Sequence, residues 1–342
     1  MPKAQILSSD QLGNLFFGQL HPYHQDFFDG LIGQHTRVPL RLLPHYIFWR
    51  DSEEAKLEES LYYRYLKESW RYYLPDDNTH EKRIYKVRNY IALYSEIQRD
   101  GIREPITVAT APDGESVIVD GNHRCSIAYH LGIDVPCQRI SLQRVLARII
   151  ENNNEFYGTA KRGLPYQSIF YGKQELVRGR RRDVLERFQK MDIVNDIRGK
   201  TVADLGSNIS MSAMLAWSFG ARAVTAYEQS KKIAASALRL STLLNSRIYC
   251  VLHDLGVPIS SNPCFDTVFC FSLYSHVRDK TALEHNIAKM TRGVLYFEGH
   301  EGSSKTDYLH IFNHFGKVEE LGFNRDGIHT RRSTRPFFRC LK

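Results

Sequence analysis

The chain has 342 residues, of which 42% are hydrophobic and 25% are charged, a composition that suits globular domains. Its length suggests two domains of ordinary size. No run approaches the roughly 20 apolar residues that cross a bilayer, and no basic N-terminal region leads into an apolar stretch. We therefore expect neither a membrane span nor a secretory signal, and a cytoplasmic location.

Six cysteines are spread along the chain, and none forms a C-x-x-C pair. Three of them lie in predicted strands or at strand ends. We expect reduced, mostly buried thiols and no metal site. The cysteines are Cys125, Cys137, Cys250, Cys264, Cys270 and Cys340.

The net charge of +8 is distributed unevenly. Residues 161–342 contain 28 Lys and Arg against 17 Asp and Glu, whereas residues 1–160 contain 18 against 21. A basic half points to an anionic partner, which can be nucleic acid, a phosphorylated small molecule or a phosphorylated glycan. Ordinary solvated basic surface is the alternative.

The N-terminal half shows both helical and strand patterns. We expect a short helix from Ser9 or Asp10 to Leu20, a strand at Val38–Trp49 with a break at Pro44, helices at Lys56–Tyr73, Glu81–Asp100 and Ser141–Glu151, and strands at Pro105–Ala109, Ser116–Val119 and Val135–Ile140. Asparagines 152–154 and Gly158 mark a boundary. The predicted organisation is an N-terminal extension (1–35), a first domain (36–151), a linker (152–164) and a second domain (165–342).

The segment after Val119 reads Asp120-Gly121-Asn122-His123-Arg124 and opens a helix that ends at Gly132. Exposed amides at a helix start, together with an arginine guanidinium, can bind phosphate oxygens. Asp120 can hold a metal or orient a nucleophile, and His123 can take or give a proton.

This segment resembles the nucleotide-binding box of the ParB/sulfiredoxin-like fold, an α+β domain, over about residues 36–140. The best match is to free serine kinases of that fold, which implies ATP or ADP with Mg²⁺, phosphate binding by Gly121, Asn122, His123 and Arg124, and a catalytic role for Asp120. Asn122 stands where sulfiredoxins carry cysteine, so their chemistry is not expected. The candidates for a general base are Asp51, Glu53 and Glu54. The alternative is a scaffolding domain in which Asp120 and Arg124 form an ion pair.

The segment Lys200–Phe219 carries the strongest signal. An apolar run reaches Asp204, turns through small residues that include Gly206, and enters a helical pattern. Such a turn points backbone N–H groups at a ligand, and Gly206 permits a close approach or an unusual backbone angle. The next predicted strands are Ala223–Tyr227, which leads to Glu228, Ser246–Leu252, which leads to Asp254, and Phe265–Phe271, which leads to His276.

This order resembles class I S-adenosylmethionine (SAM)-dependent methyltransferases over about residues 165–342. The resemblance implies a Rossmann-like, seven-stranded α/β domain with Gly206 near the methionine part of SAM, Glu228 on the ribose and Asp254 near the adenine. The other residues of the implied cofactor site are Asp204, Asn208, Leu255 and Phe271. The family's D-x-G-x-G-x-G loop is D-x-G-x-N-x-S here. A nicotinamide-binding domain is the alternative, but its G-x-G-x-x-G motif is absent.

The stretch before this core resembles the methyltransferase domain of polysaccharide chain-terminating kinase–methyltransferases. It contains Tyr166-Gln167, then Arg180–Arg182 and Arg187. The resemblance implies SAM contacts by Tyr166 and Arg187, and a planar guanidinium suits the SAM carboxylate. That family's Ser-Val-x-His-His motif corresponds to residues 272–276, where only the second histidine remains. His276 is therefore the catalytic candidate on the acceptor side, and any role for position 275 is in doubt.

We expect a SAM-dependent O-methyltransferase that acts on a phosphorylated or otherwise anionic glycan or small molecule, with an N-terminal ATP- or ADP-binding domain that serves as a kinase. A hydroxyl acceptor would need a base such as His276, whereas a phosphate is already anionic. Arg331, Arg332 and Arg335 can attract an anionic acceptor. The main alternative is a nucleic-acid methyltransferase with a ParB-like DNA- or RNA-reading domain. A third is a non-catalytic subunit with a decayed SAM pocket.

Overall fold

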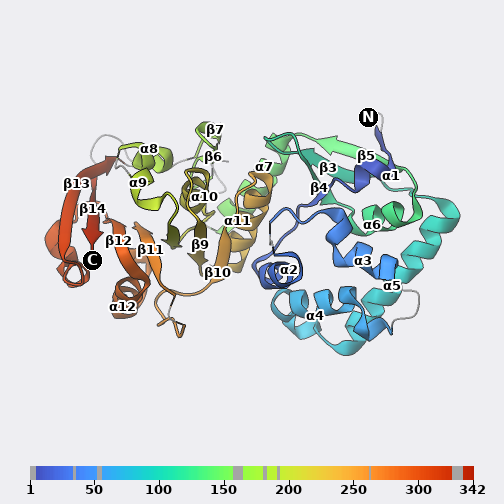
Figure 1. Ribbon diagram of the computed structural model, residues 1–342, viewed down its shortest axis with the longest axis horizontal. Coiled ribbons are helices and arrows are strands. Elements are labelled where there is room, and N and C mark those ends of the chain that lie inside the picture. The colour runs from blue at the N-terminus through green and yellow to red at the C-terminus, as the bar shows by residue number, and fades with distance from the viewer. Residues whose placement is uncertain are drawn as a thin grey trace. The chain divides into compact units, whose positions relative to one another are not determined.

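The computed structural model of the chain describes residues 5–33, 36–51, 56–156, 165–179, 183–190, 193–261, 263–325 and 334–342 (Figure 1). The chain divides into two compact units, Met1–Ala147 with Thr242–Asn245, and Arg148–Ser241 with Ser246–Lys342. Within the described ranges, no helix has the length and apolarity needed to cross a membrane.

The first unit is built on a five-stranded sheet with the order β1-β5-β3-β4-β2. Its strands are β1 (Gln5–Leu7), β2 (Phe16–Phe17), β3 (Ile106–Thr110), β4 (Ser116–Asp120) and β5 (Val135–Ile140). Strand β3 is antiparallel to β4 and parallel to β5, with helix α6 (Asn122–Leu131) between β4 and β5 in the sequence. The strands predicted at Pro105–Ala109, Ser116–Val119 and Val135–Ile140 are thus confirmed as β3, β4 and β5. The first 35 residues, predicted as an extension, contribute β1 and β2 to the sheet.

Helices make up most of the rest of this unit. They are α1 (Ser9–Leu12), α2 (Gln25–Ile32), α3 (Pro44–Asp51), α4 (Leu61–Tyr73), α5 (His80–Asp100) and α7 (Leu142–Phe156), with short 3₁₀ turns η1 (Pro22–His24), η2 (Leu40–Leu42), η3 (Leu57–Glu59) and η4 (Pro75–Asp77). Helices α4 and α5 confirm the predicted pair, and their N-caps Ser60 and Thr79 accept hydrogen bonds from backbone amides three residues on. Helix α7 extends beyond the predicted end at Glu151 and includes asparagines 152–154, which the sequence analysis takes as a boundary.

Two predicted elements of this half are wrong. The segment Val38–Trp49 was predicted as a strand, but it forms η2 and α3. Pro44 takes the first helical position, where its missing N–H costs nothing, and Ile47 and Phe48 are buried on one face of the helix. Helix α1 ends at Leu12 and not at Leu20, because Phe16–Phe17 pair with β4.

The interior of the first unit contains two buried histidines, His24 and His45, and the half-buried His123 among aromatic side chains. The rings of His45 and His123 have centroids 4.7 Å apart, and His24 stacks on Tyr65 at 4.8 Å. Burial lowers the pKa of His24 and His45 well below the usual range and lowers the pKa of His123 to about 4. All three imidazoles are therefore neutral at pH 7.

Acidification is expected to destabilise the first unit between about pH 6.5 and about pH 4. In that window the unfolded chain protonates these imidazoles while the folded unit keeps His123 neutral, so the free energy of unfolding falls as the pH falls. His123 alone should lower it by about 3 kcal/mol at the acid end of the window. Circular dichroism followed during acid titration measures the effect.

His45→Phe supplies the matched control for this acid transition. The variant keeps an aromatic ring and removes one titrating group, and His45 Nδ1 has no hydrogen-bond partner among the described residues. Its acid midpoint should lie below that of the wild type. Equal midpoints in the two proteins would contradict the assignment of the transition to buried histidines.

The second unit contains a seven-stranded sheet with the order β10-β9-β8-β11-β12-β14-β13. Its strands are β8 (Thr201–Leu205), β9 (Ala223–Glu228), β10 (Tyr249–Leu252), β11 (Phe265–Phe271), β12 (Thr291–Glu298), β13 (Lys317–Arg325) and β14 (Thr334–Leu341), and a hairpin of β6 (Ile169–Tyr171) and β7 (Gln174–Val177) precedes them. The first five strands of the order are parallel, and β14 is antiparallel to both of its neighbours. The predicted Rossmann-like, seven-stranded architecture is confirmed.

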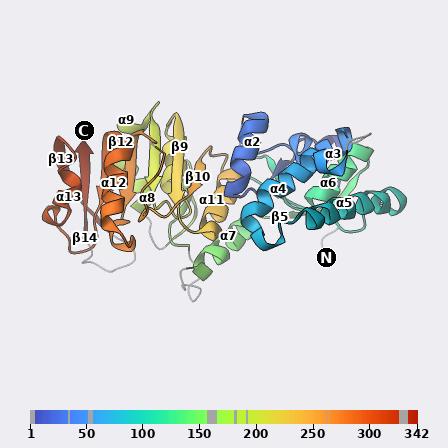
Figure 2. The ribbon, with the colours of Figure 1, turned by 90° about the horizontal axis from the view of Figure 1, so that it is seen from below.

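Helices lie on both faces of this sheet (Figures 1 and 2). Helices α8 (Asp183–Lys190), α9 (Ile193–Ile197) and α10 (Met211–Ser218) cover one face, and α12 (Lys280–Met290) and α13 (Leu309–Phe312) cover the other, while α11 (Lys231–Leu243) joins β9 to β10. Because both faces are covered, apolar residues fill the central strands on both sides. In β8, for example, Val202, Ala203 and Leu205 are all buried.

The strand order reverses at β8, which is the feature that positions a binding site. The chain proceeds from β8 to β9 and β10 on one side and returns to β11 on the other side. In sheets of this kind, ligands bind in the crevice at the carboxyl ends of the strands beside the reversal. Those ends are Leu205 of β8 and Phe271 of β11, and 3₁₀ turn η6 (Tyr274–His276) follows the second of them.

All six cysteines are free thiols, and Cys264 is the exposed one. Burial raises the pKa of the Cys250 and Cys340 thiols to about 12. The other buried thiols are also shifted upwards, so they carry no thiolate at neutral pH. The prediction of unpaired, mostly buried cysteines agrees with the structure.

Candidate functional site

A cavity of about 410 Å³ lies at the carboxyl ends of β8, β9 and β11. Its size is that of a site for a small-molecule ligand or cofactor. The ten residues that the sequence predicts for the SAM site and for catalysis in this unit all line it: Tyr166, Arg187, Asp204, Gly206, Asn208, Glu228, Asp254, Leu255, Phe271 and His276. The structure therefore brings together side chains that are dispersed over more than a hundred positions of the sequence.

The turn between β8 and α10 has left-handed backbone angles at alternate positions. Gly206 has φ +69°, and Asn208 and Ser210, which replace glycines of the related motif, have φ 56° and 60°. Asn208 Oδ1 accepts a hydrogen bond of 2.8 Å from the Ile209 amide, which is the local bond that lets asparagine adopt this conformation. At Gly206 a Cβ would come within 2.5 Å of a Leu273 methyl carbon, so any other residue would displace the Leu273 side chain. The turn therefore has left-handed angles at the positions of the motif's second and third glycines, although Asn208 and Ser210 stand there.

Glu228 ends β9 with its carboxylate held from two sides. Its Oε2 accepts from the Asn208 amide at 3.0 Å and its Oε1 accepts from the Ser230 amide at 2.9 Å. Burial raises its pKa, and these backbone bonds act in the opposite direction. A carboxylate has about four acceptor sites, so the fixed group can still accept from a hydroxyl in the cavity.

Asp204 is the buried acid of the site. Its side chain is 3% exposed, and Oδ2 has no hydrogen-bond partner in the part of the chain that the structure describes. Burial raises its pKa to about 7, and the opposing effects of a backbone hydrogen bond from Ala213 and of Arg187 are smaller. A buried carboxyl oxygen without a hydrogen-bond partner costs free energy. A cationic group in the cavity would supply the missing partner and would stabilise the ionised form of Asp204. The ammonium group of an amino-acid cofactor fits this requirement.

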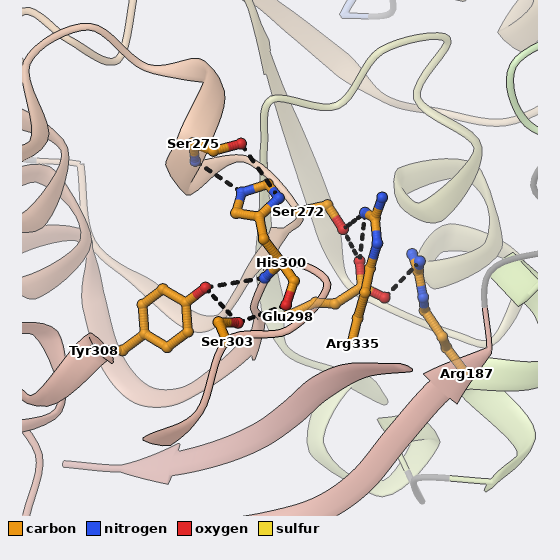
Figure 3. A network of polar contacts seen from close by, with 8 residues as sticks. All are labelled: Arg187, Ser272, Ser275, Glu298, His300, Ser303, Tyr308 and Arg335. Carbon is orange, nitrogen blue, oxygen red and sulfur yellow. Dashed lines mark hydrogen bonds and ion pairs between the residues drawn. The ribbon is translucent and has the colours of Figure 1, made fainter. Parts of the chain in front are cut away.

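A buried ionic network lies beside the cavity (Figure 3). Arg187 Nη2 is 2.9 Å from Glu298 Oε1, and Arg335 Nη1 is 3.9 Å from Glu298 Oε2. Ser272 donates to Glu298 and accepts from Arg335, and the Arg187 guanidinium lies 4.9 Å from the centre of the Phe271 ring. Two guanidinium groups thus share one carboxylate next to the cavity.

The sequence analysis predicts neither Glu298 as a site residue nor its ion pair with Arg187. Glu298 ends the apolar run of β12, just as Glu228 ends β9, so the signal was present in the sequence. Among the predicted arginines, Arg335 joins this network, while Arg331, Arg332 and Arg180–Arg182 lie outside the described residues.

The contacts of the Asp120–Arg124 segment in the first unit differ from those of an open phosphate-binding site. Asp120 ends β4, Gly121 has φ +99° and Asn122 begins α6. The Arg124 guanidinium is 3.0 Å from Asp120 and 2.9 Å from Glu104, so carboxylates already neutralise it. The structure thus contains the ion pair that the scaffolding alternative expects.

Two further predicted residues of the first unit are placed as follows. His123 is half-buried, and its Nε2 shares a hydrogen bond of 2.7 Å with the Tyr62 hydroxyl. Asp51, a candidate base, pairs with Arg50 at the surface, and Glu53 and Glu54 lie outside the described residues. In the ranges that the structure covers, no three His, Cys, Asp or Glu side chains are arranged to hold a metal ion.

No family model matches the chain, and no curated protein matches it. Solved structures similar to it include the N-terminal domain of EvdMO1 in the presence of SAH and D-fucose, which is 13% identical over 58% of this chain and 97% of that one, with a TM-score of 0.44. Magnesium protoporphyrin IX methyltransferase (ChlM) of Synechocystis PCC 6803 with bound SAH is 14% identical over 58% and 99%, with a TM-score of 0.40. The 16S rRNA N2 G1207 methyltransferase RsmC of T. thermophilus, in complex with AdoMet and guanosine, is 16% identical over 46% and 42%, with a TM-score of 0.37.

Proposed function

We propose that the second unit binds SAM and transfers its methyl group to an oxygen of a phosphorylated or otherwise anionic glycan or small molecule. The observation that carries this proposal is the cavity at the strand-order reversal, where Asp204 is buried with an unpartnered oxygen and Glu228 is fixed at the end of the next strand. The similarity to solved structures is too low to support an activity, so the proposal rests on these residues.

The charged groups of SAM have counterparts around the cavity. Its ammonium group suits Asp204, its carboxylate suits the Arg187 guanidinium, and its ribose hydroxyls suit Glu228. Asp254 and Leu255 follow β10 in the sequence and line the cavity where the adenine is expected. When bound, SAM supplies a methyl group on a sulfonium, which is open to attack by a nucleophilic oxygen.

The acceptor side is marked by His276, which lines the cavity. A hydroxyl acceptor must lose a proton, and His276 can take it, whereas a phosphate monoester needs only to be positioned. Arg335 and Lys280 lie near the neighbouring His300 and lower its pKa in addition to the larger effect of burial, while Glu298 acts in the opposite direction. The two cations favour an anionic acceptor over a neutral one.

For the first unit, binding of ATP or ADP and phosphotransfer stay predictions. The pairing of Arg124 with two carboxylates speaks against an open phosphate site, and an incoming phosphate would have to displace them. Incubation of the full chain with labelled ATP and phosphate acceptors, with Asp120→Ala as the comparison, tests them. No transfer, or transfer that Asp120→Ala leaves unchanged, would remove the proposed catalytic role of Asp120.

The methyltransferase proposal is tested with the full chain, SAM labelled in its methyl group, and separate panels of phosphorylated sugars, phosphorylated metabolites, RNA and DNA. Label is expected on a phosphorylated sugar or metabolite. Label on nucleic acid alone would favour the alternative function, a nucleic-acid methyltransferase. The basic composition of residues 161–342, with 28 Lys and Arg against 17 Asp and Glu, also favours that alternative. Failure of the chain to bind SAM would overturn both.

A further inference from the structure

His300, which the sequence predictions missed, contacts the turn that carries His276 (Figure 3). The Ser275 amide donates to His300 Nε2 at 2.7 Å, and the Ser275 hydroxyl and His300 Nδ1 share a hydrogen bond of 3.2 Å. The rings of His300 and His276 have centroids 5.6 Å apart at an angle of 78°. His276 lines the cavity and is exposed there, and His300 contacts the residue before it in the chain.

The backbone of His300 is itself firmly held (Figure 3). Its amide donates to the Tyr308 hydroxyl at 2.9 Å, its carbonyl accepts from Ser303, and Tyr308 donates to Ser303 at 2.8 Å. The preceding Gly299 is packed so closely that a Cβ would lie 2.8 Å from both Ser303 and Tyr308. The imidazole therefore projects from a rigid platform at the end of β12.

The hydrogen bonds define the protonation state of His300. Because Nε2 accepts the Ser275 amide proton, the ring proton of the neutral imidazole is on Nδ1, where it can be donated to the Ser275 hydroxyl. Burial lowers the pKa of His300 to about 4, and Arg335 adds to this shift. The ring is thus neutral at pH 7 and keeps both contacts with Ser275.

We infer that His300 is a positioning residue for the acceptor side: by binding both polar groups of Ser275, it fixes η6 so that the His276 imidazole faces the cavity. This inference rests on the proposed function, since it assigns His276 to the acceptor that receives the methyl group. It also gives a physical role to position 275, where the related motif carries a histidine and this chain carries serine. The second imidazole beside this turn comes from the segment after β12 and not from the motif.

Carbethoxylation of His276 by diethyl pyrocarbonate, followed by mass spectrometry of the full chain with and without saturating SAH, tests the inference. Saturating SAH should slow modification of His276 about fivefold in the wild type, because a ligand in the cavity covers the residues that line it. His300→Gln, whose side-chain oxygen can accept from the Ser275 amide, should retain this protection. His300→Leu keeps the bulk without the hydrogen bonds and should lose it.

The affinity for SAH, measured by calorimetry, should agree within about twofold among the three proteins, because His300 does not line the cavity. His285→Ala, at an exposed position on α12, should behave as the wild type. Exchange of the Ser275 amide hydrogen gives a second reading and should be faster in His300→Leu alone. Equal protection of His276 in the wild type and His300→Leu would overturn the role of His300. Absence of SAH binding to the wild type would instead overturn the proposed function on which the inference rests.

Discussion

Glu228→Ala is expected to weaken SAM binding by at least about 100-fold, because it removes the carboxylate that would accept both ribose hydroxyls. Hydrogen bonds to a charged group contribute about 1.5–3 kcal/mol each, so two of them account for about 3 kcal/mol or more. The variant also releases the amides of Asn208 and Ser230, which are bonded to this carboxylate. Calorimetric titration with SAM measures the loss.

Glu320→Ala is the matched control for this variant, since Glu320 is an exposed glutamate on β13 of the same unit. It should bind SAM with the affinity of the wild type. Thermal melting of both variants shows whether the fold is retained. An affinity of Glu228→Ala within about twofold of the wild type would be incompatible with the ribose-binding role of Glu228.

Glu298→Ala should lower the free energy of unfolding of the second unit by about 3–5 kcal/mol, since removal of one member of a buried ion pair leaves an uncompensated charge. Arg187 and Glu298 are 2% and 0% exposed, and Arg335 depends on the same carboxylate. Denaturant unfolding of the intact chain, followed by a probe in the second unit, measures the change. The loss should also reduce SAM affinity, because Arg187 is no longer held at the cavity.

The comparison for Glu298→Ala is Glu319→Ala, which removes a more exposed glutamate bonded to Arg339 at 3.0 Å. Such a pair contributes only about 0–1 kcal/mol. A difference of several-fold between the two losses is therefore expected. Equal losses of unfolding free energy in the two variants would show that the buried Arg187–Glu298 pair stabilises the unit no more than the more exposed Arg339–Glu319 pair.

The acidic residues of the cavity could be predicted because each stands at or just beyond the end of an apolar strand pattern. Asp204, Glu228 and Asp254 mark three such runs, and parallel strands bring their carboxyl ends to one edge of a sheet. Tyr166 and Arg187 could be named only through the family resemblance. The expectation of a ligand site at this edge used local periodicity and the order of the strands. It held even where the glycine pattern departed from the related motif, because Asn208 and Ser210 adopt the left-handed conformation themselves.

Residues whose role depends on distant contacts could not be predicted in the same way. Arg187 meets Glu298 across 111 positions and Ser275 meets His300 across 25, and no local pattern contains either pair. The strand predicted at Val38–Trp49 failed for a related reason. Its branched and aromatic residues suit a strand, but α3 packs against α4 and α6, and that packing outweighs the local preference.

The most direct test of the account is a calorimetric titration of the full chain with SAM near pH 6, performed in buffers of different ionisation enthalpy. Burial holds the pKa of Asp204 at about 7, so most of the free protein carries a protonated carboxyl at that pH. Binding of a ligand ammonium should ionise it and release close to one proton, with affinity rising as the pH increases to about 7. Asp204→Asn should lose the proton release and bind about 30-fold more weakly. One-to-one binding with this release is the predicted result. No binding, or equal affinity in Asp204→Asn without proton release, would contradict a SAM site built on Asp204.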